Sequence, residues 1–193
     1  MTSTCPALLD RFIERPDVRE RFETTVHAPA SLVMKVATTF DMQSLPAVKM
    51  IFRLREVLLG AKAGGPRAPR GILEETQSLG WGVLDERANA YVVCGARCQP
   101  WRADVVFTAI APADFRRYAG PDEVKIAWTI EAIEGTPGVT RLAQETRAIA
   151  TDAASRVKFR HYWRWARFGI VAIRLLMLPA VRREAERRWR HAR

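Results

Sequence analysis

The sequence predicts an α+β fold in which a curved antiparallel sheet is covered by one long C-terminal helix. A strand-like alternation over 20–28 precedes two helical segments, and helical periodicity runs from Asp152 to the C-terminus with a break only at Pro179. Between them lie about six short alternating segments typical of antiparallel strands, at 72–79, 82–87, 90–98, 103–111, 122–134 and 139–151. Because a meander of strands twists and curls, the terminal helix is the element that must bury its apolar face.

The first seventy residues supply the elements that close one end of this sheet. Thr4 is positioned to cap a short helix, and the alternation of apolar and polar residues over 20–28 indicates the first strand. A helix is expected over 29–40 and a second over 45–60, where apolar residues recur at helical spacing. Residues 60–71 are rich in Gly, Pro and Arg but lack the Gly-Lys-Ser/Thr sequence of a phosphate-binding loop, so we expect a surface loop.

Length and charge narrow the function classes. The chain of 193 residues fits one domain, and 48% hydrophobic residues beside 27% charged ones favour a folded chain over a disordered one. The net charge of +10 comes entirely from 153–193, which hold 12 Lys and Arg against 2 Asp and Glu, whereas 1–152 hold 19 of each sign. This asymmetry disfavours a basic nucleic-acid-binding domain and favours a cationic helix attached to a neutral body.

Cysteine and histidine usage gives no sign of a metal or cofactor. Cys5, Cys94 and Cys98 are too few for a disulfide framework, and the last two lack the second pair that a structural zinc site needs. The start of the chain lacks the basic and apolar regions of a signal peptide, and no run reaches the ~18 apolar residues of a membrane-spanning helix. We therefore expect a reduced cytoplasmic protein without a bound metal or cofactor.

Several segments resemble the START/polyketide cyclase-like superfamily, whose members share the helix-grip fold. The segment HAPASLVMKVATTFDMQSLP is similar to that superfamily's pattern of strand, Ala-Pro-Ala, helix, Asp and Pro, and PDEVKIAW, TRLAQETRAIATDAASRVKFRHYW and REAE resemble bacterial members with no established substrate. The resemblance covers about 20–188. It implies a helix-grip ligand-binding domain over 19–178, between an N-terminal extension (1–18) and a basic helix end (179–193). No catalytic residue carries over, because the superfamily has no universal one.

The two longest strands predict which residues face the cavity that a curled sheet and a helix would enclose. If 135–138 form a four-residue turn, Glu134 lies opposite Val139 and Trp128 lies opposite Glu145. The expected cavity face carries Val124, Ile126, Trp128, Ile130, Ala143, Glu145, Arg147 and Ile149. The face expected to meet water carries Lys125, Thr129, Glu131, Gln144 and Thr146. Glu145 and Arg147 are then a structural ion pair or a polar anchor for a carboxylate, phosphate or carbonyl group, and Glu145 is also a weak candidate for an acid or base.

The C-terminal helix presents an apolar stripe that we expect to face the sheet, made of Val157, His161, Trp165, Phe168, Ala172 and Leu176. His161 is the titratable member of this stripe, and it is either a core histidine or a weak candidate for a catalytic base. The predicted ligand-binding residues are Trp128, Glu145, Arg147, His161, Trp165 and Phe168.

The expected function is binding, and with it transport or sequestration, of one apolar or amphipathic small molecule in that cavity. One alternative is a cyclase- or dehydratase-like enzyme acting on a polyketide-like substrate, with His161 or Glu145 moving protons. Another is a peripheral membrane protein that exchanges lipid, since six Arg follow Pro179 around Trp189 and could meet an anionic membrane surface. Those residues are otherwise a solvated helix end. Nucleic acid is disfavoured, because the sequence has no recognition motif.

Overall fold

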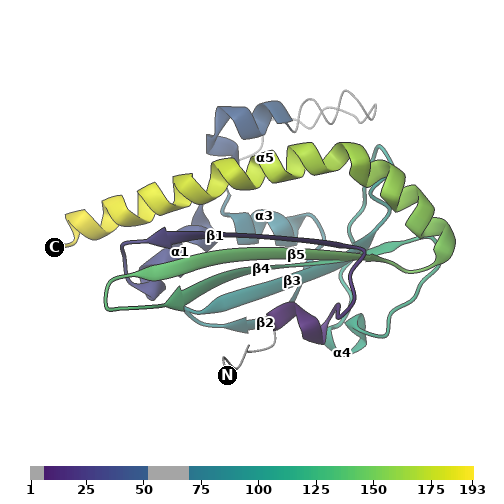
Figure 1. Ribbon diagram of the computed structural model, residues 1–193, viewed down its shortest axis with the longest axis horizontal. Helices are drawn as coiled ribbons and strands as arrows, with labels where there is room; N and C mark the ends of the chain where they lie inside the picture. Colours follow the sequence, from purple (N-terminus) through teal and green to yellow (C-terminus); the bar gives the residue numbers. More distant parts are fainter. Residues whose placement is uncertain (1–6, 52–69) are drawn as a thin grey trace, which may run out of the picture.

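The computed structural model describes residues 7–51 and 70–193, and it has an open antiparallel sheet with a long helix packed against it (Figure 1). The five strands lie in the order β1-β5-β4-β3-β2. Their bounds are Val18–Val26 for β1, Gly82–Arg87 for β2, Tyr91–Cys98 for β3, Val124–Glu134 for β4 and Thr140–Ala150 for β5. Helix α5 spans Ala153–His191 and crosses the sheet lengthwise. The α+β prediction is therefore confirmed.

The shorter helices cover the two faces of the sheet unequally. Helices α1 (Ala30–Thr39) and α3 (Ile72–Ser78) pack on the same face as α5, and residues 46–51 are also helical. On the opposite face lie η1 (Leu8–Arg11), drawn in purple, and α4 (Pro112–Phe115) (Figure 1). A further short turn, η2 (Met42–Ser44), follows α1. The predicted cap at Thr4 and most of the predicted 45–60 helix and 60–71 loop fall outside the described residues.

Two segments predicted as strands have other structures. The segment 72–79 contains helix α3 (Ile72–Ser78), because Ile72 and Thr76 bury one helical face and two acidic residues occupy the favourable first turn. Gly71 before this helix lies so close to α1 that a Cβ atom would come within 2.8 Å of the Thr38 carbonyl oxygen. The predicted strand over 103–111 is reduced to one bridge, in which Thr108 exchanges two backbone hydrogen bonds with Arg97.

The register between β4 and β5 differs by one residue from the predicted one. Glu134 pairs with Thr140 and Trp128 pairs with Thr146, so the connection is a five-residue loop instead of a four-residue turn. Gly138 has a φ of 78°, a left-handed conformation that closes this loop. A shift of one residue moves every side chain of a strand to the other face. The face of β5 that meets α5 is therefore the one predicted to meet water.

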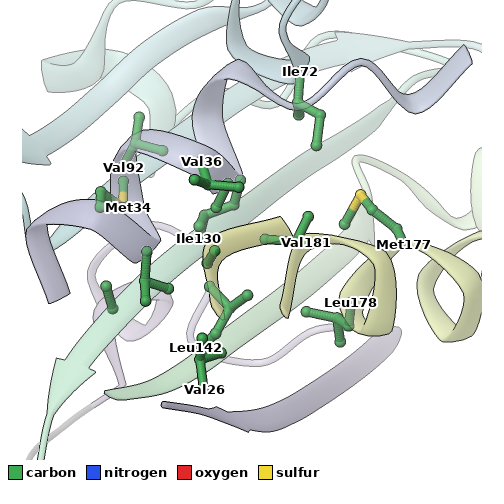
Figure 2. Close-up of a cluster of buried hydrophobic side chains, with 14 of the residues drawn as sticks. Val26, Met34, Val36, Ile72, Val92, Ile130, Leu142, Met177, Leu178 and Val181 are labelled. Carbon is green, nitrogen blue, oxygen red and sulfur yellow. The ribbon is translucent and has the colours of Figure 1, made fainter. Parts of the chain in front are cut away.

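The main core lies between the sheet and the helices α1, α3 and α5, and Figure 2 shows hydrophobic side chains that build it. The strands contribute Val26, Val92, Ile130 and Leu142, and α5 contributes Met177, Leu178 and Val181. Full burial of each such side chain contributes about 1.5–3 kcal/mol. This packing fixes α5 over the β1 and β5 side of the sheet.

A second core lies on the opposite face, under η1 and α4. Phe12 meets Phe115 edge to face, with ring centroids 6.0 Å apart, and the buried cluster around them is completed by Leu9, Ile13, Leu84, Val93, Ile110 and Ala127. The sheet is thus buried on both faces where these elements cover it.

Helix α5 is one continuous element of 39 residues. Asp152 begins it with a capping box, since its carboxylate accepts a hydrogen bond from the Ser155 N–H and the Ser155 hydroxyl oxygen accepts one from the Asp152 N–H. The predicted break at Pro179 is wrong, because the helix continues through that residue. Pro179 is exposed, and so is Leu175, whose carbonyl is the one that lacks an N–H partner four residues later. Within the described residues, no helix combines the length and the apolar character that crossing a membrane requires.

Candidate functional site

The six predicted ligand-binding residues lie in three separate places. Trp128 is buried on the α5 side of the sheet, as predicted. Glu145 and Arg147 are buried on the opposite face, under η1, because of the one-residue difference in register. His161, Trp165 and Phe168 are exposed on α5. The structure does not bring these six side chains together, and the two weak catalytic candidates, His161 and Glu145, share no common space.

The predicted sheet-facing stripe of α5 is the stripe that faces away from the sheet. Val157, Trp165 and Phe168 are 64%, 77% and 66% exposed. The side chains that meet the sheet and its neighbours are instead Ser155, Phe159, Met177, Leu178, Val181 and Ala185. Both stripes recur at helical spacing and both are largely apolar, so the period alone could not distinguish them.

Glu145 and Arg147 belong to a buried ionic network between β5, β1 and the N-terminal segment. Arg147 Nε lies 2.6 Å from Glu145 Oε1, and Arg147 Nη1 donates to Asp10 Oδ1 at 2.6 Å and to the Ile13 carbonyl at 2.7 Å. The Glu145 carboxylate also accepts hydrogen bonds at 2.9 Å from Arg19 Nε and from Arg21 Nη1. Both side chains therefore have several partners within the protein.

The charge state of Glu145 follows from this network. Burial by itself would raise the pKa of Glu145, but hydrogen bonds from Arg147 and Arg21 outweigh burial and hold the pKa below its ordinary value. A carboxylate that is ionised and encircled by three arginines has no proton to donate. Among the three predicted roles of this pair, the geometry favours the structural ion pair.

Two other polar side chains point into the space between the sheet and α5 without full partners. Gln144 is 6% exposed, and its Oε1 atom has no hydrogen-bond partner within the described part of the chain. Arg174 of α5 donates from Nη2 to Thr146 Oγ1 at 2.7 Å, while its buried Nη1 atom has no partner there. Burial lowers the pKa of Arg174 to about 10, against the opposing effect of Glu20. Two elements thus present one unpaired donor and one unpaired acceptor to the same interior.

Sequence reasoning missed these residues for identifiable reasons. The one-residue register difference assigned Gln144 and Thr146 to the face expected to meet water. Arg174 is a single charge within the apolar run FGIVAIRLLMLPAV. A charged residue inside such a run is itself a signal, because an arginine is placed among apolar side chains only where something satisfies it.

The space beside these residues is small in this structure. A cavity of about 10 Å³ lies between sheet and helix, lined by Ala37, Ile130, Leu142, Gln144, Met177, Leu178 and Val181. Such a volume is close to the minimum that one water molecule needs. The cavity expected between the sheet and α5 is therefore almost filled in this conformation, by side chains of α5 and α1 (Figure 2).

A larger hollow of about 400 Å³ lies at the C-terminal end of α5, lined by His27, Pro137, Gly138, Glu186, Trp189, Arg190 and Arg193. The Arg193 guanidinium lies 4.9 Å from the centre of the Trp189 ring, and Trp189 packs partly buried against the main core. Glu184 binds both Arg187 and Arg188, which lowers the pKa of Glu184 to about 2. The aromatic residue and much of the charge at this helix end therefore have partners within the protein.

Thiol chemistry and metal binding have little support in the geometry. Burial raises the pKa of Cys94 to about 12, so this thiol stays protonated at neutral pH and is a poor nucleophile. Across residues 7–51 and 70–193, no group of three or more His, Cys, Asp or Glu side chains is placed to hold a metal ion.

Comparison with known proteins does not assign this site. No protein-family model matches the chain, and no curated protein matches it significantly.

Proposed function

We propose that the protein binds an amphipathic small molecule between the sheet and α5, with the polar end of the ligand held by Arg174, Gln144 and Thr146. The observation that carries this proposal is the pair of unpaired buried atoms, Arg174 Nη1 and Gln144 Oε1, on facing elements. A buried polar group without a hydrogen bond costs about 1–3 kcal/mol, and a charged one costs more. A ligand that supplies both partners removes that cost.

The chemistry of the two atoms defines the ligand class. Arg174 Nη1 needs an acceptor, and a guanidinium fits a carboxylate or phosphate oxygen best. Arg174 keeps its positive charge at neutral pH, since burial lowers its pKa only to about 10, and an anionic partner offsets the cost of burying that charge. Gln144 Oε1 needs a donor such as a hydroxyl group. The best match is an amphipathic acid that carries a hydroxyl group near its acidic end.

The apolar part of such a ligand has a defined place. Trp128, Ile130 and Met177 are buried side chains around the same interior, and the existing cavity beside Gln144 marks where their packing is incomplete. A ligand of ordinary size must move α5 away from the sheet or repack its side chains, because the cavity holds no more than one water molecule. The resemblance of the sequence to the START/polyketide cyclase-like superfamily supports the same location for a ligand.

Native mass spectrometry of freshly purified protein tests this proposal. We expect a co-purifying small molecule, or uptake of a hydroxylated fatty acid, in the wild type and at least a tenfold weaker affinity in Arg174→Met. Arg164→Met is the matched control, because Arg164 is an exposed arginine of the same helix and its loss should leave uptake unchanged. Unchanged uptake by a folded Arg174→Met variant would reject the site.

The same variant carries a second prediction that separates binding from folding. Without ligand, Arg174→Met removes an incompletely paired buried charge and fills its place with an apolar side chain. An unpaired buried donor costs about 1–3 kcal/mol, and its removal offsets the loss of the Arg174 hydrogen bond to Thr146, which is of similar size. We therefore expect the free energy of unfolding in urea to stay equal or rise while ligand uptake falls. A large loss of stability would show that Arg174 is a structural residue and would contradict the proposed site.

A further inference from the structure

We propose that the outer face of α5 docks the protein on anionic lipid bilayers. The outer face of α5 is defined here by its exposed apolar side chains, Val157, Trp165, Phe168, Leu175 and Leu176. This inference concerns a surface separate from the site between the sheet and α5, so it does not depend on the proposed function.

The outer face is a continuous helical stripe. Its members recur at intervals of seven or eight and three residues, which places them on one side of a helix. They are 39–77% exposed, with Trp165 the most exposed of them. From Val157 to Leu176 the stripe extends about 28 Å along the helix axis at 1.5 Å per residue. Helix α5 therefore has a second apolar side opposite the one that meets the sheet.

Cationic side chains flank this stripe. Arg160, Arg164 and Arg167 are exposed on α5, and the Arg167 guanidinium lies 5.2 Å from the centre of the Phe168 ring. The sequence has no Asp or Glu between Asp152 and Glu184. Nearby acidic groups from other elements reach the beginning of the helix, where Asp17 pairs with Arg156 and Asp122 pairs with Lys158.

The middle of α5, and not its C-terminal end, is where exposed aromatic side chains lie beside arginines that have no acidic partner among residues 7–51 and 70–193. At the end of the helix, Glu184 and Glu186 pair with three of the arginines and Trp189 packs against the core. The docking surface that we propose is therefore centred on Trp165 and Phe168 and not on Trp189.

Charge complementarity selects an anionic bilayer as the occupant. A helix with aromatic and aliphatic residues on one face and arginines beside them is typical of helices that lie in a membrane interface. Two copies of this face would bring two sets of arginines together, which disfavours self-association. A nucleic acid would meet the arginines but would leave the leucine and valine side chains unpaired with any apolar surface. A bilayer containing phosphatidylglycerol offers both negative headgroups and an apolar interior.

Vesicle co-sedimentation of the full chain tests the proposal, with phosphatidylcholine vesicles that contain about 30% phosphatidylglycerol or none. We expect binding to the anionic vesicles at low salt, weak binding to the neutral ones, and a steep fall as ionic strength rises. Each arginine near a bilayer contributes roughly fivefold in affinity. Arg160→Gln, Arg164→Gln and Arg167→Gln together should therefore weaken binding about 100-fold.

Matched variants separate this face from general attraction between a cationic protein and a negative surface. Trp165→Ser with Phe168→Ser should reduce binding at least tenfold, while Leu79→Ser with Val106→Ser, at exposed apolar residues outside α5, should leave it unchanged. Likewise Arg87→Gln, Arg102→Gln and Arg117→Gln remove three exposed arginines outside α5 and should have a small effect. Circular dichroism establishes that each variant is folded.

Several results would overturn the proposal. These are absence of binding to anionic vesicles at low salt, equal binding to both vesicles, or equal losses in the variants and their controls. Concentration-dependent dimerisation that disappears in Trp165→Ser with Phe168→Ser, without vesicle binding, would assign the face to a second copy of the chain. Arg174→Met should bind vesicles like the wild type, so failure of the proposed ligand site and failure of membrane docking are distinguishable.

Discussion

Arg147 and Glu145 lie two residues apart on β5 and form an ion pair at 2.6 Å with side chains only 2% and 1% exposed. Their position under η1 ties the N-terminal segment to the sheet, because Arg147 also binds Asp10 and the Ile13 carbonyl. The pair thus links β5 to the N-terminal segment, which lies more than a hundred residues earlier in the sequence. Its removal should affect folding before it affects any ligand.

Arg147→Met should lower the free energy of unfolding by about 3–5 kcal/mol, because it leaves a buried carboxylate with fewer partners. Urea denaturation monitored by tryptophan fluorescence measures this change. Arg141→Met is the matched control on the same strand, since the Arg141 side chain is 55% exposed and its pair with Glu23 is worth about 0–1 kcal/mol. Equal effects of the two substitutions would contradict the structural role of the network.

The lowered pKa of Glu145 predicts that the free energy of unfolding decreases in acid. Its pKa is lower in the folded protein than in the unfolded chain, so its stabilising contribution is fully present above the unfolded value near 4.5. The contribution is lost as pH falls below that value through the folded pKa. We therefore expect the difference in unfolding free energy between wild type and Glu145→Gln to be largest near neutral pH and to shrink below about pH 4.5. A pH-independent difference between pH 7 and pH 3 would show that the fold does not lower the pKa of Glu145.

The left-handed conformation of Gly138, in the loop between β4 and β5, predicts how substitutions there affect stability. Its φ of 78° is left-handed and a Cβ atom there would meet nothing within 4 Å, so a substitution costs backbone strain alone. Gly138→Ala should destabilise the protein by about 1 kcal/mol. Gly138→Asn should cost less, because asparagine tolerates the left-handed conformation. Thermal unfolding of the two variants checks this order, and the reverse order would contradict a strained turn at this residue.

The sequence by itself determined the fold class and the main elements of this protein. The alternating residues over 122–134 and 139–151 and the helical periodicity after Asp152 are local patterns that follow from burying one face of a strand or helix. They predicted the antiparallel sheet, the long C-terminal helix and the helix after Pro29. The count of charged residues also shows that the whole net charge lies in 153–193.

Only the tertiary structure decided which faces are buried. One extra residue in the loop closed by Gly138 moved Glu145 and Arg147 away from α5 and brought Gln144 and Thr146 towards it. The alternation within a strand does not specify which of its two faces is the inner one, because a change of one residue in loop length exchanges the faces. Helix α5 has two apolar stripes, and the choice between them depends on which one fits the side chains of β4, β5 and α1. For this reason Trp165 and Phe168 face outward, and Arg174, a single charge in an apolar run, became a candidate ligand anchor.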